Sequence, residues 1–152
     1  MKPVRGQPPT FFRQKISSRM AEANSLCLNL RALLQDSGLR RPCFAVELLA
    51  RECLNNAVLH GNRCNTGKSI VLRLWVGREW IRLQVSDEGP GFPWRKARKN
   101  QADTSASSGR GLQLCALYAG RVRFNRRGNQ ITLWINKKNP TGKEDRDGCL
   151  CR

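Results

Sequence analysis

The sequence predicts an α+β domain in which helices cover one face of a sheet. Three observations predict this class: two long helical patterns come first, two alternating strand patterns joined by a tight turn follow, and a short helix and a second hairpin complete the series. Helices with one apolar face pack together on one side of such a sheet. We therefore expect a two-layer α/β sandwich with a mixed, mostly antiparallel sheet.

Two helices are predicted in the first part of the chain. The first has Ser17 or Ser18 as its N-cap, leucines at helical intervals, and Gly38 as its stop signal. The second covers residues 42–60 with the same periodicity. Ordered structure is expected to begin near Ser17, because residues 1–15 are rich in Pro, Gly and basic side chains and form a loose arm or a poor edge strand.

The strands are predicted as two hairpins on either side of a long loop. Residues 68–76 and 79–86 alternate apolar and polar side chains around a tight Gly-Arg turn. Residues 89–111 have no periodicity, and a loop of this length is usually functional or mobile. The remaining predicted elements are a short helix over 111–118 and a hairpin of residues 121–125 and 130–136.

Length and composition predict one globular domain. A chain of 152 residues buries a sufficient core without disulfide or metal staples. We expect an N-terminal arm or weak edge strand (1–15), the folded domain (16–138) and a disordered charged tail (139–152). No apolar stretch reaches membrane-spanning length and the N-terminus lacks the apolar core of a signal peptide, so we expect a cytoplasmic protein without a membrane partner.

The seven cysteines are odd in number and follow no disulfide framework, which favours a reducing compartment. A zinc site of His60 with Cys64, or of the tail thiols Cys149 and Cys151, lacks a second properly spaced pair. No metal other than magnesium is therefore expected. Three cysteines lie in apolar helical patterns and are predicted to be small core residues: Cys43, Cys53 and Cys115.

The chain is strongly basic, with 28 Lys and Arg against 11 Asp and Glu and a net charge of +17. Such an excess favours nucleic acid, an anionic membrane surface or an acidic protein as partner. The cations are spread along the sequence, and no helix-turn-helix, zinc-finger or aromatic ribonucleoprotein motif accompanies them. A solvated cationic surface is the preferred interpretation, and nucleic-acid binding is the minority one.

The second helix carries a polar row beside its apolar side. Because each residue advances by about 100 degrees, Glu52, Asn56 and His60 form one i, i+4 row at the margin of the core-facing side. A carboxylate and an amide there are costly unless they are paired, bind metal or line a cavity. An amide oxygen suits magnesium, and a Glu one turn earlier can activate a hydroxyl. Alternatively, an Arg pairs with the Glu, and the Asn caps a loop. A second row is expected to point to solvent: Glu47, Arg51 and Asn55.

A carboxylate and two glycines follow the second predicted strand directly, in the sequence Asp-Glu-Gly-Pro-Gly. Gly89 and Gly91 allow backbone conformations closed to other residues and the close approach of a flat ligand. Asp87 provides an inward-facing acceptor, which is the group needed to bind an adenine amino group. The same composition is also typical of an ordinary turn.

A Gly-x-Gly pattern at residues 108–112 precedes the third predicted helix and follows a Ser/Thr-rich segment, as a lid would. Backbone N–H groups at a helix N-terminus hold phosphate oxygens, and an Arg adds positive charge. The alternative is a simple glycine-rich hinge. The candidate nucleotide-binding residues here are Gly109, Arg110, Gly111 and Leu112.

These three patterns, in this order on helix, strand-turn and loop-helix, resemble the N, G1 and G2 boxes of the GHKL ATPases, which share the Bergerat ATP-binding fold. The resemblance covers about residues 17–138. The small size and the His60-Gly61 pair after the Asn-containing helix most resemble the anti-sigma-factor serine-protein kinases of bacterial partner-switching systems.

The resemblance implies ATP and Mg²⁺ as cofactors. It implies that the enzyme phosphorylates an antagonist protein on Ser, sequesters a regulatory partner such as a sigma factor, and forms a homodimer. Positioning and charge neutralisation supply most of the catalysis in such transfers. The implied roles are general base for Glu52, magnesium ligand for Asn56, adenine-reading carboxylate for Asp87, adenine-pocket shaping for Gly89 and Gly91, and phosphate binding for Gly109 and Gly111.

The chain departs from the family pattern before its last strand. Where members often carry a Gly-Thr-Thr-like turn, this chain has Gly128, Asn129 and Gln130, so one expected hydroxyl contact to the nucleotide is missing. Two alternatives to a kinase therefore stay open: a non-catalytic ATP-binding regulatory module and a basic nucleic-acid-binding domain.

Overall fold

Five strands form one sheet in the order β1-β2-β3-β5-β4, and every neighbouring pair is antiparallel. The structure is a computed structural model that describes residues 10–99 and 108–141. The strands are β1 (Thr10–Ser17), β2 (Ser69–Val76), β3 (Trp80–Asp87), β4 (Arg121–Phe124) and β5 (Gln130–Asn136). The predicted α+β class is confirmed, and the sheet is antiparallel throughout these residues rather than mixed.

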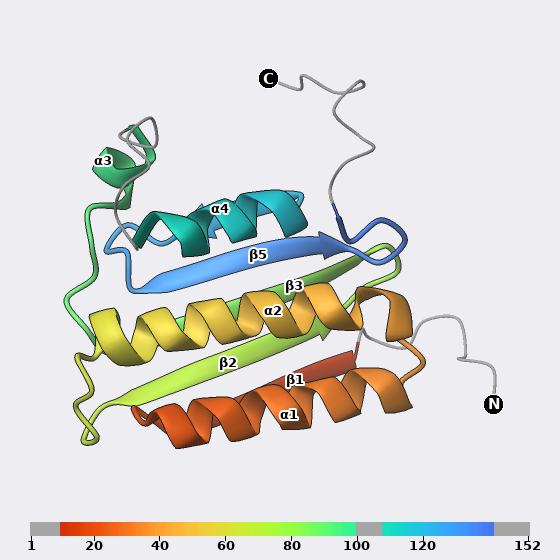
Figure 1. Ribbon diagram of the computed structural model, residues 1–152, viewed down its shortest axis with the longest axis horizontal. Coiled ribbons are helices and arrows are strands. Elements are labelled where there is room, and N and C mark those ends of the chain that lie inside the picture. The colour runs from red at the N-terminus through yellow and green to blue at the C-terminus, as the bar shows by residue number, and fades with distance from the viewer. Residues whose placement is uncertain (1–9, 100–107, 142–152) are drawn as a thin grey trace.

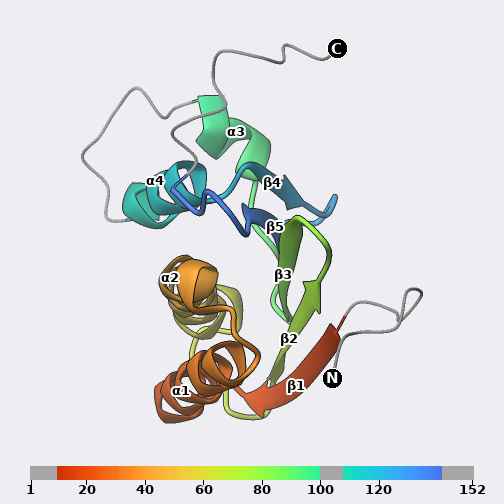
Figure 2. The same cartoon turned by 90° about the vertical axis from the view of Figure 1, so that its right-hand side faces the viewer.

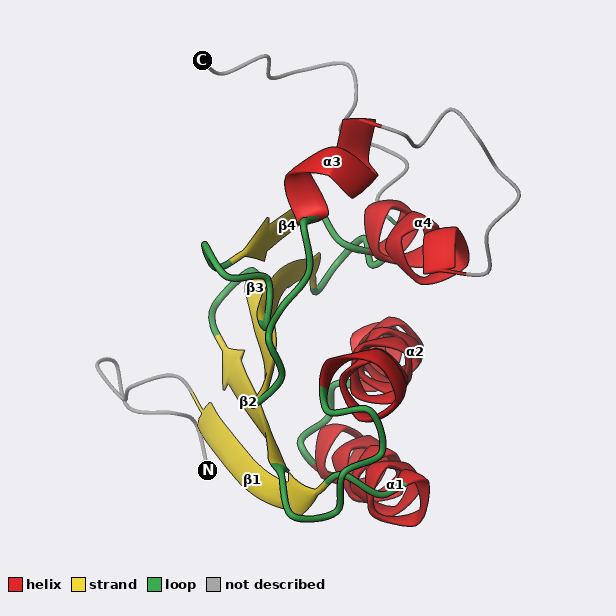
Figure 3. Ribbon diagram, turned by 90° about the vertical axis from the view of Figure 1, so that its left-hand side faces the viewer, coloured by secondary structure: helices red, strands yellow, loops and turns green. Residues whose placement is uncertain are grey.

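Three helices lie side by side over one face of this sheet, and the described part of the chain places no helix on the opposite face (Figure 1, Figure 2). A fourth, short helix lies beside the β4 edge (Figure 3). The helices are α1 (Met20–Asp36), α2 (Arg40–Asn56), α3 (Trp94–Lys99) and α4 (Ser108–Tyr118). None of the described helices is long and apolar enough to cross a membrane.

The core lies between the sheet and the helices. Alternate residues of β2 and β3 point to the helices and are fully buried, as the period of two predicts. Burying an aliphatic side chain of this size contributes about 1.5–3 kcal/mol. The largest fully buried side chains are Leu26, Leu30, Leu34, Leu49, Leu54, Ile70, Leu72, Leu74, Ile81, Leu83, Leu133 and Ile135.

The chain becomes ordered earlier than predicted. Residues 10–17 pair along their whole length with β2, so they form the edge strand that was one of the two alternatives predicted for this segment, and order does not begin near Ser17. Residues 1–9, and with them most of the predicted arm, lie outside the described part of the chain. The tail beyond residue 141 does so as well.

The predicted N-caps of the first helix are wrong. α1 begins at Met20 without a side-chain cap. Ser17 instead ends β1, and its N–H and hydroxyl donate to the Glu22 carboxylate at 2.8 and 3.0 Å. These bonds lower the pKa of Glu22. The Ser18 hydroxyl is buried and has no hydrogen-bond partner among the described residues.

Two helices are longer than predicted. α2 begins at Arg40, and after Asn56 it continues as the π-helical turn η1 (Ala57–Gly61). α4 begins at Ser108, so the Gly-x-Gly pattern forms its first turn instead of preceding it. The segment 89–111 also contains α3, a helix too short for its period to be visible in the sequence.

Four cysteines are buried with free thiols: Cys27, Cys43, Cys53 and Cys115. The last three are the predicted core residues. Cys64 is exposed, and Cys149 and Cys151 lie outside the described residues. Within residues 10–99 and 108–141, no group of three or more His, Cys, Asp or Glu side chains is placed to hold a metal ion.

Gly38 ends α1 as predicted, with a φ of +74°. A Cβ added there would have no neighbour within 4 Å, so a substitution meets only backbone strain. We expect Gly38→Ala to lower the free energy of unfolding by about 1–2 kcal/mol, because an L-residue disfavours the left-handed region. Gly38→Asn should lose less, since Asn tolerates this region better. Urea unfolding measures both, and an unchanged stability of Gly38→Ala would contradict the assignment.

Candidate nucleotide site

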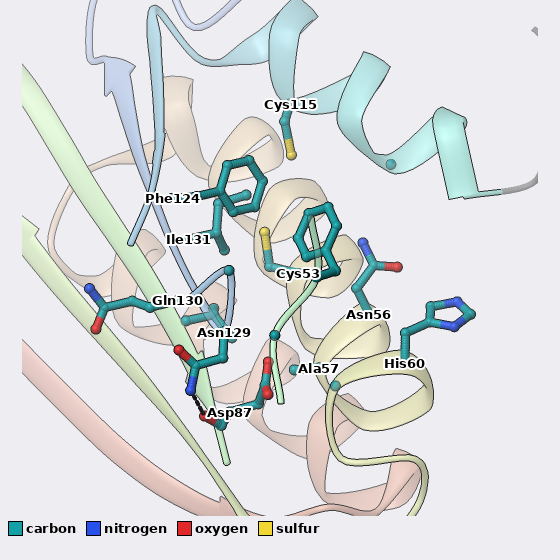
Figure 4. Close-up of a pocket in the computed structure, with 16 residues that line it drawn as sticks. Cys53, Asn56, Ala57, His60, Asp87, Cys115, Phe124, Asn129, Gln130 and Ile131 are labelled. Atoms are coloured by element: carbon teal, nitrogen blue, oxygen red, sulfur yellow. Dashed lines mark hydrogen bonds between the residues drawn. The ribbon is translucent and has the colours of Figure 1, made fainter. Parts of the chain in front are cut away.

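A cavity of about 280 Å³ opens between α2, α4 and the ends of β3 and β5 (Figure 4). This volume is close to the lower end of the range for small-molecule sites. Five of the ten predicted site residues line it: Asn56, His60, Asp87, Gly91 and Gly111. The three sequence patterns therefore meet at one place, although they are far apart along the chain.

The first pattern meets the third where α2 approaches α4. A Cβ added to Gly111 would lie 3.1 Å from Nδ2 of Asn56 and 3.5 Å from Oε2 of Glu52. Asn56 is exposed and lines the cavity, whereas Glu52 is half-buried beside it and is not part of its lining. Glu52 has no hydrogen bond or ion pair with another described side chain, so its oxygens are available as acceptors.

The neighbouring row of α2 does not face solvent as predicted. The Glu47 side chain is only 14% exposed and forms ion pairs with Arg31 and Arg51, each at 3.4 Å. The Asn55 side-chain oxygen is buried without a hydrogen-bond partner among the described residues. The reason is that α1 packs along this side of α2 (Figure 1), which the periodicity of α2 alone does not reveal.

Asp87 lies at the floor of the cavity, where the end of η1 meets the loop after β3. A Cβ on Gly89 would lie 2.0 Å from the carbonyl oxygen of Gly61, and one on Gly61 would lie 2.5 Å from the carboxylate carbon of Asp87. Such distances admit no side chain at either glycine. The Gly89 N–H donates to Oδ1 of Asp87 at 2.8 Å, so Gly89 supports the carboxylate from below although it does not line the cavity.

Asn62, which the sequence patterns did not single out as a site residue, fixes this junction. It is 2% exposed, its Nδ2 donates to the carbonyl of Ser69 at 3.0 Å, and its Oδ1 accepts the N–H of Glu88 at 2.9 Å. The Glu88 carboxylate in turn accepts hydrogen bonds from the N–H and hydroxyl of Ser69. One buried amide thus joins the end of η1 to both β2 and β3. Its position directly after the His-Gly pair was the available sequence signal.

The turn between β4 and β5 forms the opposite wall. Gly91 and Gly128 both have a φ of +81°, and added Cβ atoms would lie 1.8 Å from the carbonyl oxygen of Arg127 and 2.3 Å from that of Phe92. The two loops therefore cross in direct backbone contact.

Asn129 stands in the turn where family members often carry a hydroxyl side chain, and its amide lies beside the Asp87 backbone. Nδ2 of Asn129 donates to the Asp87 carbonyl at 3.1 Å, and the Asp87 N–H donates to the Asn129 carbonyl at 2.9 Å (Figure 4). The departure from the family pattern thus supplies a polar residue to the cavity wall.

Apolar side chains that the sequence patterns did not single out form the rest of the lining. Most come from α2, α4 and the strands, and Phe92 comes from the loop after β3; composition gives no signal for them. Phe124 is held in place by Phe92 in an edge contact at 5.2 Å and by Trp94 in a stacked contact at 5.5 Å. The apolar lining residues include Cys53, Val85, Phe92, Cys115, Phe124 and Ile131.

The remaining predicted residues belong to the first turn of α4. Gly109, Arg110 and Leu112 lie in this turn, and the side chains of Arg110 and Leu112 are outside the described part of the structure. First-turn N–H groups have no intrahelical acceptor, so a Gly-x-Gly turn inside the helix still offers donors for phosphate oxygens.

Burial raises the pKa of the Asp87 carboxyl, while the Gly89 N–H and the charges of Lys68 and Arg127 act in the opposite direction. The folded state therefore binds this proton more tightly than the unfolded chain does. Protonation stabilises the fold as the pH falls through the folded-state pKa, and ionisation destabilises it above.

We expect the stability of Asp87→Asn relative to wild type to increase as the pH rises through the titration of Asp87. The variant keeps the acceptor for Gly89 but has no carboxylate to ionise. Urea unfolding at a series of pH values from about 3 to 7 measures the difference, since ordinary Asp titrates near 3.9. A difference that stays constant or shrinks with rising pH would contradict the assignment.

Gly89→Ala is expected to destabilise the fold by about 1–3 kcal/mol, because the added methyl must displace backbone rather than a flexible side chain. Gly67→Ala is the matched control, since its Cβ would meet only the Asn65 side chain at 3.2 Å. Thermal unfolding compares the two. Equal melting temperatures for both variants would show that the Gly61–Gly89 approach is looser than described.

Comparison with known families identifies one match. A model of the histidine kinase-like ATPase domain matches residues 16–135, a range that includes all ten predicted site residues. No curated protein matches the chain.

Proposed function

The chain belongs to the histidine kinase-like ATPase family of the GHKL superfamily, and on this premise we propose that it is an ATP-dependent serine-protein kinase that also sequesters a regulatory partner. Family membership supports ATP binding, and ATP-dependent phosphoryl transfer in general. The observation that carries the proposal is the convergence of Glu52, Asn56 and Gly111 at one side of a cavity that has Asp87 at its floor.

The Asp87 side of the cavity suits adenine. A carboxylate supported by the Gly89 N–H accepts a hydrogen bond from an amino group, and a donor from a ligand offsets the cost of its burial. The apolar lining around Phe92 and Ile131 favours a flat ring over a charged group. We assign adenine recognition to Asp87, with Gly91 shaping the wall.

The α2–α4 side of the cavity suits phosphates and magnesium. Asn56 is exposed and carries an amide oxygen, Glu52 lies one turn away, and a Cβ on Gly111 would lie within 3.5 Å of both side chains, so the glycine keeps the space between them open. A neutral oxygen ligand at a site open to water fits Mg²⁺, which keeps most of its water ligands. Bound there, the ion neutralises phosphate charge. We assign its ligation to Asn56, and phosphate binding to the α4 turn with Gly109, Arg110, Gly111 and Leu112.

Glu52 is the proposed general base. It is half-buried beside the phosphate side and is unpaired among the described side chains, so it can take a proton. The substrate serine oxygen bonds to the γ-phosphorus, the bond from that phosphorus to the β-phosphate oxygen of ATP breaks, and the serine proton passes to Glu52. His60 lines the cavity next to Asn56 and belongs to the proposed nucleotide site.

The substrate and partner are proposed from the resemblance of the Asn56-containing helix and its His60-Gly61 pair to the anti-sigma-factor kinases. These are an antagonist protein phosphorylated on Ser, a sigma factor as the sequestered partner, and a second copy of the chain in a homodimer. The competing function is a non-catalytic module in which ATP controls only partner binding.

We expect Glu52→Gln to abolish transfer of the γ-phosphoryl group to the antagonist protein while it preserves Mg-ATP binding, because the amide cannot take the serine proton. Radiolabelled ATP follows the transfer. Glu47→Gln on the same helix is the control and should retain activity, since Glu47 pairs with Arg31 and Arg51 away from the cavity.

Unchanged transfer by Glu52→Gln would remove Glu52 from the mechanism. No transfer by wild type, despite Mg-ATP binding, would favour the non-catalytic module.

A further inference from the structure

We propose that the helix-free face of the sheet binds single-stranded nucleic acid, at a surface separate from the nucleotide cavity. The sequence spreads its cations along the chain, but the strand register brings six of them to this one face. The face is defined by the strand residues that alternate with the buried positions. Its six cations are Arg13, Lys15, Arg73, Arg82, Arg121 and Arg123.

The helix-free face has an excess of positive charge. Asp87 is the only acidic residue in the five described strands, and it points to the cavity on the other side of the sheet. Glu79 and Glu88 lie beyond the two ends of β3. No ion pair is formed by the six cations within the described part of the chain, whereas Arg31 and Arg51 on the helical side pair with Glu47. Glu88 acts electrostatically on Lys15 at one end of the face, and the five arginines have no acidic partner among the described residues. The helix-free face therefore carries a net positive charge, which attracts a polyanion.

Planar side chains accompany the positive charge on this face. One row across the sheet runs through Trp75, Arg82, Trp134 and Arg121 as successive cross-strand partners. The Arg82 guanidinium carbon lies 3.9 Å from the centre of the Trp75 ring, and that of Arg121 lies 5.2 Å from the centre of the Trp134 ring. Bases stack on aromatic rings and on guanidinium planes, and this requires unpaired bases.

This row also contains a hydrogen-bond donor that is unsatisfied within the described part of the chain. Nε of Arg82 is buried and has no hydrogen-bond partner among the described residues. A buried donor without a partner is costly, and an acceptor brought by a ligand would offset this cost. The adjacent row adds further donors: Arg73 donates to Gln84 at 3.4 Å, and Gln84 to Thr132 at 3.1 Å, with Arg13 and Arg123 at its two ends.

Charge and stacking together favour single strands over other occupants. A second copy would bring two faces of the same positive charge together, which opposes association. An acidic protein satisfies the charge but offers no regular series of flat rings. A duplex keeps its bases stacked inside, so it uses only the cations.

The test is fluorescence anisotropy of labelled single-stranded RNA and DNA oligonucleotides with the full chain at several salt concentrations, with quenching of Trp emission as a second readout. Wild type should bind single-stranded RNA, single-stranded DNA or both. The logarithm of the binding constant should fall with the logarithm of the salt concentration, with a slope of about −0.7 for each phosphate contact. Arg121→Ala with Arg123→Ala should weaken binding roughly tenfold at ~0.1 M salt and reduce the slope by about 1.4. Arg121→Lys with Arg123→Lys keeps the charge and should lose only the stacking component.

The matched control is Arg40→Ala with Arg41→Ala, which removes two exposed cations from the helical layer and should leave binding nearly unchanged. Asp87→Asn and saturating Mg-ATP should also leave it unchanged, so this test is independent of the kinase proposal.

Four results would overturn the inference. The first is no binding by wild type, and the second is equal weakening by the two alanine double variants. The third is duplex binding as tight as single-strand binding. A dimer in sedimentation that the Arg121/Arg123 alanine variant dissociates would assign the face to a second copy instead, and would also overturn it.

Discussion

The site depends on one steric constraint, the contact of Gly61 with Gly89. The end of the α2–η1 helix and the loop after β3 approach so closely that the Gly61 carbonyl would lie 2.0 Å from any Cβ on Gly89. This contact brings the helical layer down onto the carboxyl end of β3, and it places Asp87 beneath η1. π-helical turns are rare and occur frequently at functional sites, and η1 is one such turn. The buried amide of Asn62 then ties the junction to β2 and β3.

The same constraint explains why the site is costly for the fold. Asp87 is partly desolvated, which raises its pKa, and Glu52 has no partner among the described side chains. Glu47, five residues earlier on the same helix, shows the structural alternative, since it is held by two arginines. A ligand that supplies hydrogen-bond donors and positive charge at the cavity can offset this loss of stability when it binds. This is the usual relation between an active site and the stability of its fold.

The sequence predicts well what depends on local periodicity. Both long helices, both hairpins and the place of Asn56 at the cavity, with Glu52 beside it, follow from spacing alone. β1 was predicted only as a poor edge strand, the alternative to a loose arm, because one of its inward positions is Gln14, the partner of Leu72, which interrupts the apolar alternation. The burial of Glu47, the clamp of Asn62 and the apolar lining depend on which elements pack together. That information lies in long-range pairing and not in any single segment.

The two faces of the sheet also differ in how far the sequence reveals them. Three recognisable sequence patterns predict the cavity on the helix-covered face. The cationic face becomes visible only when the strand register aligns cations from four separate segments. Calorimetry of Mg-ATP with wild type, Asp87→Asn and Glu88→Gln shows whether the cavity binds the nucleotide through Asp87. Wild type and Glu88→Gln should bind, because the Glu88 carboxylate bonds to Ser69, and folded Asp87→Asn should not. Wild-type affinity in a folded Asp87→Asn protein would contradict the claim that Asp87 recognises the nucleotide.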